Sequence, residues 1–251
     1  MKKTFTTPSG RYPDLCADML KQPHVLIAGA TGSGKSVLVN SLIYTALYQA
    51  PGDVGFVLID PKRVELNSYR NLPHTIRYAS EPEDIIATLN ECVTVMNIRY
   101  KDMQRRGLKK SSCGHVYIII DEFADLITTN KKATLTPLCR LAQLGRAANM
   151  HLILATQRPT RDIINGQIKV NIDARIALRC PTAQDSRNII NVNGAETLPR
   201  YGKGYYLTPD TMQPELVDIP MIDDGEINRI LNHWMGQRSW YWKPSYNMHR
   251  A

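Results

Sequence analysis

A lysine and a serine end a glycine-rich octapeptide near the start of the chain. It reads Gly29-Ala30-Thr31-Gly32-Ser33-Gly34-Lys35-Ser36, which has the G-x-x-x-x-G-K-[ST] spacing of a phosphate-binding loop. Glycines permit the tight turn that points backbone N–H groups at phosphate oxygens. We expect residues 29–36 and Val37 to bind ATP, with Lys35 at the β- and γ-phosphates and Ser36 on Mg²⁺. The alternative is a glycine-rich turn without a ligand.

Two carboxylates follow an apolar run in the middle of the chain. Residues 115–120 read as a buried strand, and Asp121 and Glu122 come directly after it. Asp121 would hold the Mg²⁺ bound to Ser36, and Glu122 would orient or deprotonate the attacking water. One carboxylate suffices to bind ATP with Mg²⁺, so the presence of a second carboxylate favours ATP hydrolysis. The alternative is a strand that ends in a solvated acidic turn.

A third apolar run, residues 151–155, ends in Thr156 and Gln157. A neighbouring strand would bring both to the γ-phosphate, where the Gln157 amide senses the phosphate or positions water; the alternative is a loop cap. ATPase rings often complete the site with an arginine of the adjacent subunit. Arg146, Arg175 and Arg187 are candidates for this role, and we favour Arg146 because residues 144–148 are the most motif-like.

The elements that position these residues alternate along the chain. Strands are expected at 25–28, 55–59, 116–120, 151–156, 174–178 and 204–207, the last at a sheet edge; helices are expected at 36–48, 81–106, 133–146 and 183–191. The strands are apolar almost throughout, as in sheets covered on both faces. The pattern predicts an α/β fold with a mostly parallel sheet and ligand binding at the carboxyl ends of its strands.

Composition narrows the cellular setting. A formal net charge of +8 suggests a polyanionic partner, with nucleic acid first, although a basic but indifferent surface gives the same number. Five scattered cysteines in no C-x-x-C pair predict reduced thiols and a cytoplasmic protein. We expect neither a membrane span nor a secretory signal.

Residues 1–23 read as a lead-in, 24–220 as the ATPase domain, and 221–251 as a C-terminal helix with a basic-aromatic tail.

Several segments in order resemble the FtsK/SpoIIIE family of DNA translocases. They are residues 24–36, 59–66 with Pro73-His74, 121–126, 144–159, 168–172, 175–177 and 185–187, and the likeness runs from about residue 20 to residue 210. The resemblance implies a RecA-like motor that uses ATP to move double-stranded DNA through a ring, usually a hexamer. It also implies that Asp60, Lys62 and Glu65 lie near the nucleotide and the subunit boundary.

The chain departs from this family in some respects. Phe123 stands where the family commonly has leucine, and no anchor segment, long linker or winged-helix domain is evident. We therefore expect a minimal motor of a mobile element, phage or plasmid, working with a separate membrane-associated or DNA-orienting partner.

Basic residues after Gln157 are the first candidates for DNA contact, because a translocating ring needs sequence-independent contacts to the phosphate backbone. They are Arg158, Arg161 and Lys169. A second basic run, Arg105, Arg106, Lys109 and Lys110, reads equally as a solvated hairpin tip. The aromatic-basic tail from Trp234 to Tyr246 could stack on bases or dock on a neighbour.

Two rival functions remain open at this point. One is a related motor for conjugative coupling, phage DNA packaging or protein secretion, acting on single-stranded DNA or on protein. The other is a nucleotide-gated adaptor with little turnover, against which the Asp121–Glu122 pair argues.

Overall fold

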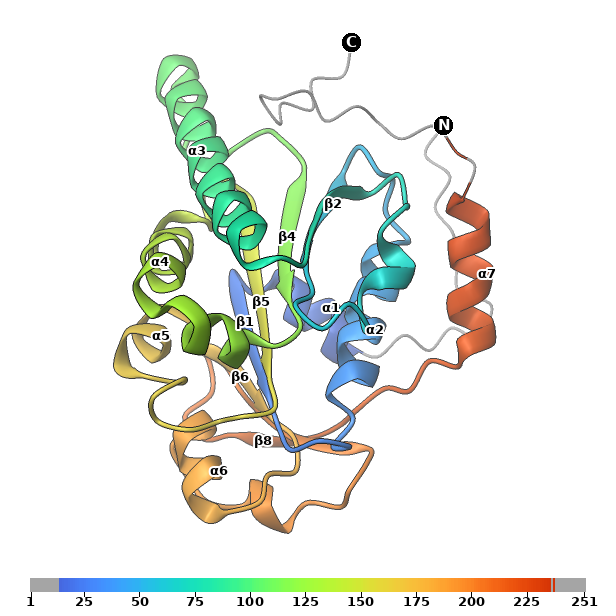
Figure 1. Cartoon of the computed structure of the whole chain (residues 1–251), viewed down its shortest axis with the longest axis vertical. Helices are drawn as coiled ribbons and strands as arrows, with labels where there is room; N and C mark the ends of the chain where they lie inside the picture. Colours follow the sequence, from blue (N-terminus) through green and yellow to red (C-terminus); the bar gives the residue numbers. More distant parts are fainter. Residues whose placement is uncertain (1–13, 236, 238–251) are drawn as a thin grey trace.

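Eight strands form one sheet in the computed structural model, which describes residues 14–235 and 237 (Figure 1). The strands lie in the order β3-β2-β4-β5-β1-β6-β7-β8. Their bounds are β1 His24–Ala28, β2 Val54–Ile59, β3 Thr75–Ala79, β4 His115–Ile120, β5 Met150–Thr156, β6 Ala174–Ala177, β7 Lys203–Leu207 and β8 Glu215–Asp218. Strands β1 to β6 pair in parallel, whereas β6–β7 and β7–β8 are antiparallel. The predicted mostly parallel α/β fold is confirmed.

Helices cover both faces of the sheet. They are α1 Asp14–Lys21, α2 Lys35–Ala46, α3 Pro82–Arg106, α4 Phe123–Leu144, α5 Gly166–Asn171, α6 Ala183–Ile190 and α7 Asp224–Trp234, with short 3₁₀ turns η1 Asn67–Tyr69 and η2 Ala195–Thr197. Buried residues of α3, α4, α5 and α6 pack in one cluster, and those of α1, α2 and α7 pack in another. Figure 1 shows these two groups on opposite sides of the strands.

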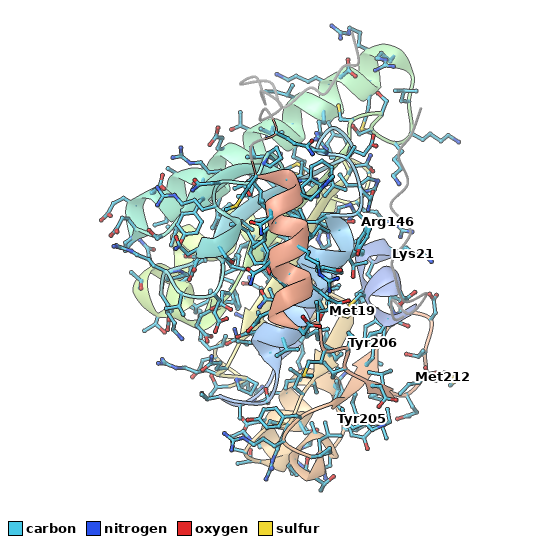
Figure 2. All side chains as sticks on the ribbon, turned by 90° about the vertical axis from the view of Figure 1, so that its right-hand side faces the viewer. Met19, Lys21, Arg146, Tyr205, Tyr206 and Met212 are labelled. Atoms are coloured by element: carbon cyan, nitrogen blue, oxygen red, sulfur yellow. The ribbon has the colours of Figure 1, made fainter. Side chains whose placement is uncertain are left out.

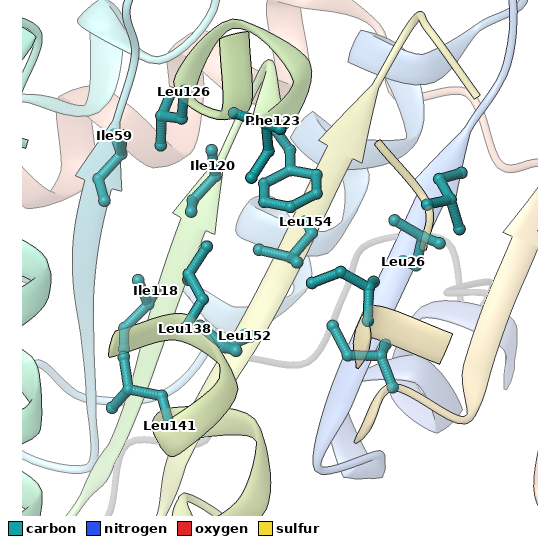
Figure 3. Packing of buried hydrophobic residues seen from close by; sticks show 14 of the residues in the cluster. Leu26, Ile59, Ile118, Ile120, Phe123, Leu126, Leu138, Leu141, Leu152 and Leu154 are labelled. Carbon is teal, nitrogen blue, oxygen red and sulfur yellow. The ribbon is translucent and has the colours of Figure 1, made fainter. Parts of the chain in front are cut away.

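The central strand β4 shows why residues 116–120 are all buried and largely apolar. Ile118 and Ile120 pack on the face that α4 covers with Leu138 and Leu141 (Figure 3). The intervening Ile119 belongs to the opposite cluster. Because successive side chains of a strand point to opposite faces, a strand that is covered twice must be apolar throughout.

The prediction for residues 204–207 was wrong in its placement. Strand β7 lies between β6 and β8, so the edge of the sheet is β8. Strand β8 consists of two acidic and two apolar residues and is mostly exposed, with Leu216 56% exposed. Its sequence therefore lacks the continuous apolar run by which the central strands were predicted. Strand β3, at the other edge, was missed for a similar reason, because the exposed Arg77 interrupts it and only Ala79 of its residues is fully buried.

Two helices differ from expectation. The lead-in at 1–23 contains α1, which packs on α2, with Cys16 and Met19 fully buried. Helix α4 begins at Phe123, ten residues before the predicted start, and bends at Asn130, where φ is −153° and ψ 83°. The two parts of α4 therefore read as separate segments. Within residues 14–235 and 237, no helix has the length and apolar character that crossing a bilayer requires.

The strand order sets the place of the site. Strands β4, β5 and β1 are neighbours and run in parallel, so their carboxyl ends at Ile120, Thr156 and Ala28 lie at one edge of the sheet. The phosphate-binding loop, the Asp121–Glu122 pair and Gln157 each follow directly after one of these strands, whereas Arg146 precedes β5. The carboxyl ends of these three parallel strands therefore place the predicted site residues next to one another, which no single motif could do.

Candidate nucleotide site

The loop between β1 and α2 has the backbone that its glycines allow. Gly32 and Gly34 have φ of 73° and 93°, a region that side-chain-bearing residues rarely adopt. At Gly29 the restriction is space, because a Cβ there would lie 2.6 Å from Ser33 Oγ and 2.7 Å from Leu178 Cβ. The tight turn expected of a phosphate-binding loop is thus present over residues 29–34.

The start of α2 is open to an anion. Gly34 caps the helix without a side-chain hydrogen bond, and the first turn contains no acidic residue. The first amides of a helix have no intrahelical acceptor, and they carry the positive end of its dipole. The Ser33 hydroxyl is also buried without a partner. These donors fit a bound triphosphate group.

Lys35 and Asp121 form a buried ion pair between the loop and the end of β4. Lys35 Nζ lies 2.6 Å from Asp121 Oδ1 and donates a second hydrogen bond of 2.8 Å to the Asp121 backbone oxygen. Ser36, the next residue, is half-buried at the same end of the helix. The Asp121 carboxylate and the Ser36 hydroxyl are oxygen ligands of the kind that Mg²⁺ prefers. Among the described residues no group of three or more His, Cys, Asp or Glu could hold a metal, so phosphate oxygens and water would complete this site.

Glu122 is buried and held from three sides. Thr156 Oγ1 donates to its carboxylate at 2.7 Å, and the Gln157 backbone N–H lies 3.1 and 3.2 Å from its two oxygens. Lys62 Nζ approaches at 3.4 Å from the loop after β2. These contacts hold the Glu122 carboxylate in one place beside the phosphate-binding loop, where a carboxylate could act on a water molecule.

The side chain of Gln157 faces the phosphate-binding loop. Its Oε1 accepts a hydrogen bond of 2.8 Å from Thr31 Oγ1. A polar chain therefore runs from Thr31 through Gln157 to Glu122, with its links supplied by three separate segments of the sequence. The structure brings together Lys35, Ser36, Asp121, Glu122 and Gln157, as the motifs predicted.

Arg146 lies away from this group. It is exposed in the turn before β5, whose 7 residues span about 20 Å from the amino to the carboxyl end. Figure 2 labels Arg146 near mid-height of the molecule, just above the label of Lys21, which precedes β1. Arg99 fixes this turn by donating to the backbone oxygens of Ala148 at 2.6 Å and Gly114 at 3.0 Å. Arg146 therefore reaches no phosphate of its own chain.

The other two arginine candidates have partners in their own chain. The guanidinium of Arg175 is buried and donates to the backbone oxygens of Ile172 and Ile189. That of Arg187 is bonded to the side chains of Gln184 and Asn193. Arg175 is thus committed to the packing of α5 and α6 against β6.

The candidate DNA contacts differ in exposure. Arg158 and Arg161 are exposed after β5. Lys169 is only partly exposed, because its Nζ donates to Arg187 O at 3.3 Å and Asn191 Oδ1 at 3.1 Å. Burial, then the charges of Arg175 and Arg161, lower the pKa of Lys169.

The second basic run is partly neutralised. Arg105 and Arg106 both pair with Asp102, at 2.7 and 3.2 Å, near the end of α3. In the C-terminal region, Trp234 ends α7 and donates from Nε1 to Leu47 O at 3.0 Å, so it packs on its own chain. The rest of the predicted tail, 238–246, lies outside the described residues.

Sequence reasoning missed two cations beside the site, Arg179 and Arg200, and the contacts of a third, Lys62. Lys62 was predicted only to lie near the nucleotide, whereas it contacts Glu122 and, at 3.8 Å, Asp125. Arg179 and Arg200 line a cavity beside the loop. Arg179 follows β6 at the carboxyl edge, a position that the sheet rule could have indicated; nothing in the local sequence marks Arg200. Asp60, in contrast, is fully buried and closes its own loop by accepting from Leu66 N at 3.0 Å.

Fold and site together define a P-loop ATPase with a RecA-like α/β domain. The chain belongs to the FtsK/SpoIIIE family, whose sequence profile matches residues 11–118 and 114–161. It is 37% identical over 270 residues to the DNA translocase FtsK of Vibrio vulnificus, covering 92% of this chain and 27% of that protein. It thus spans less than a third of the length of the curated relatives it matches.

Two solved structures have the same fold. The pCW3 conjugation coupling protein TcpA, in monomer form with ATPgS, superposes with a TM-score of 0.74 at 24% identity, over 86% of this chain and 66% of that one. The cytoplasmic domain of the Type VII secretion ATPase EccC of Thermomonospora curvata gives 0.72 at 22% identity, over 86% of this chain and 28% of that one. At these identities the likeness concerns the fold.

Proposed function

We propose that this chain hydrolyses ATP with Mg²⁺ and uses the free energy to translocate double-stranded DNA as a homo-oligomeric ring, with six subunits. The observation that carries the proposal is the buried Glu122 carboxylate, bonded to Thr156 and Gln157 beside an open phosphate-binding loop. DNA as the cargo is supported by 37% identity to proteins named DNA translocase FtsK and by the net charge of +8.

Backbone N–H groups and the Lys35 ammonium would bind the nucleotide together. The first amides of α2 and the Lys35 ammonium would hold the phosphates, and Asp121 with Ser36 would hold Mg²⁺. The metal, when bound, neutralises charge on the phosphates.

Hydrolysis rests on Glu122. Its carboxylate takes a proton from the attacking water, and Gln157 orients that water from the end of β5. The neighbouring subunit supplies Arg146, which stabilises charge on the transferred phosphoryl group. A second subunit is needed for this step, because Arg146 lies before the amino end of β5, whereas Gln157 follows its carboxyl end.

DNA contact is assigned to Arg158 and Arg161, which are exposed directly after Gln157, with Lys169 as a further candidate. A shift of Gln157 between nucleotide states would move the segment that contains Arg158 and Arg161. Changes at the nucleotide site would thereby be coupled to the contacts with DNA. We place the chain in the cytoplasm, because ATP and DNA are available there and its five thiols are free.

The test is the ATPase rate without DNA, with duplex DNA and with single-stranded DNA, each at several protein concentrations. The proposal predicts strongest stimulation by duplex and a specific activity that rises with concentration, since the arginine acts between subunits. Stronger stimulation by single strands would favour the coupling or packaging alternative. Absence of stimulation by either DNA would favour a protein cargo, and absence of turnover would favour an adaptor.

A further inference from the structure

Two arginines that no motif contains border the phosphate-binding loop. A cavity of ≈ 280 Å³ lies beside the loop and is lined by Ala30, Thr31, Gly32, Ser33, Arg179 and Arg200. The lining has no acidic residue. Its charged groups are two guanidiniums, so the cavity favours an anion.

Both arginines are placed by the backbone. Arg179 follows β6, the neighbour of β1, and its backbone oxygen accepts a hydrogen bond of 2.8 Å from Ala30 N. Arg200 lies between η2 and β7, and its Nη2 is 3.0 Å from the point where a Cβ on Gly32 would stand. The guanidinium of Arg200 therefore lies directly against the loop backbone at Gly32, a contact that any larger residue there would obstruct.

Neither guanidinium is neutralised within the part of the chain that the structure describes. No carboxylate of residues 14–235 or 237 forms an ion pair with Arg179 or Arg200. Arg200 has instead a cation–π contact, with its Cζ 5.3 Å from the centre of the Tyr201 ring. Two like charges beside one cavity repel each other, and a bound anion would relieve that repulsion.

The position of Gly32 indicates which phosphate these cations face. Thr31, the adjacent residue, is hydrogen-bonded to Gln157, and Gln157 contacts the hydrolytic carboxylate Glu122. The bond that hydrolysis breaks is that of the terminal phosphate, so this end of the loop is the terminal-phosphate end. The amides at the start of α2 hold the inner phosphates from the other end.

We propose that Arg200, with Arg179, binds the terminal phosphate of a nucleoside triphosphate within the same chain, and so makes the site prefer triphosphate over diphosphate. The inference rests on the proposed nucleotide site but not on DNA or on a ring. A guanidinium donates paired, charge-assisted hydrogen bonds to two oxygens of one phosphate group. A diphosphate lacks the terminal phosphate and therefore lacks these acceptor oxygens. Arg146, by contrast, would act between subunits.

The test is equilibrium binding of ATPγS and of ADP, each with Mg²⁺, at protein concentrations where the chain is monomeric. Arg200→Ala should raise the Kd for ATPγS about tenfold or more and that for ADP less than about twofold. Arg200→Lys should give an intermediate value, because an ammonium keeps the charge but not the paired geometry. Arg229→Ala, an exposed arginine of α7, serves as the matched control and should change neither constant.

Several outcomes would overturn the assignment. Equal weakening of both nucleotides, or no change in either, would show that Arg200 does not read the terminal phosphate. A loss of preference seen only in oligomers would place the guanidinium between subunits. If the unmodified chain binds neither nucleotide, the proposed function itself fails; if it binds both and Arg200→Ala keeps the preference, only this inference fails.

Discussion

The Thr31 hydroxyl donates a hydrogen bond of 2.8 Å to the Gln157 side-chain oxygen, across 126 positions of the sequence. This bond joins the phosphate-binding loop to the end of β5. The Gln157 backbone N–H, in turn, contacts both oxygens of Glu122. Gln157 thus connects the phosphate-binding loop to the Glu122 carboxylate.

Replacing Gln157 by alanine should lower the maximal ATPase rate about 100-fold while ADP affinity stays near that of the unmodified chain. Without the Gln157 side-chain amide, water would no longer be oriented. The backbone N–H groups at the start of α2 and the Lys35 ammonium, which bind phosphate, would remain. Steady-state turnover and ADP titration measure the two effects. Gln143→Ala, on the exposed face of α4, is the control. An unchanged rate would remove Gln157 from the mechanism.

Replacing Glu122 by glutamine should reduce single-turnover hydrolysis about 1,000-fold and leave ATP binding intact. Glutamine can still accept the hydrogen bond from Thr156, so the local fold is kept, but it cannot take a proton from water. Glu91→Gln, exposed on α3, provides the matched comparison. If the variant still hydrolyses ATP at a normal rate, the base lies elsewhere.

Lys35→Ala should abolish turnover and also lower the free energy of unfolding by about 3–5 kcal/mol, because the buried Asp121 would lose its counter-charge. A double variant, Lys35→Met with Asp121→Asn, should recover most of that stability without recovering turnover. Urea unfolding and an ATPase assay separate the two effects. A single variant as stable as the unmodified chain would contradict a buried ion pair.

Arg146→Ala should bind nucleotide normally and lose most of its turnover. Mixing it with Lys35→Ala subunits should restore part of the activity, because each inactive subunit can present an intact Arg146 to a neighbour's intact site. Arg140→Ala, exposed on α4, should behave like the unmodified chain. Full activity of Arg146→Ala alone would leave the arginine of the neighbouring subunit to be found elsewhere.

Acid should destabilise the fold through buried histidines. Burial lowers the pKa of His74 to about 4, and that of His24 to about 4. Between the unfolded pKa near 6.5 and the folded pKa near 4, the unfolded chain binds protons that the folded chain does not, so stability falls as pH decreases through this window.

Urea midpoints at about pH 7 and about pH 5 measure this effect. His74→Gln, which can still donate to Gln49 O, should show a smaller loss of stability between the two conditions than the unmodified chain. His233→Gln, on the exposed side of α7, should show the full loss. An equal loss in all three proteins would exclude a contribution from His74.

The sequence by itself determined the phosphate-binding loop at 29–36, the carboxylates at 121–122 and the central strands, because each is a local pattern. A glycine turn followed by a helix start needs only neighbouring residues. A strand buried on both faces likewise reveals itself in a continuous apolar run. The family resemblance rested on the same contiguous segments.

Only the tertiary structure decided which distant side chains meet. The order β4-β5-β1 brings Gln157 to Thr31 and Glu122, whereas Arg146 precedes the amino end of β5. Arg175 and Arg200 look alike in sequence, yet one is bonded to carbonyl oxygens inside the fold and the other lies against Gly32. An arginine has a long side chain, and its partners depend on which strands are neighbours, which local sequence does not encode.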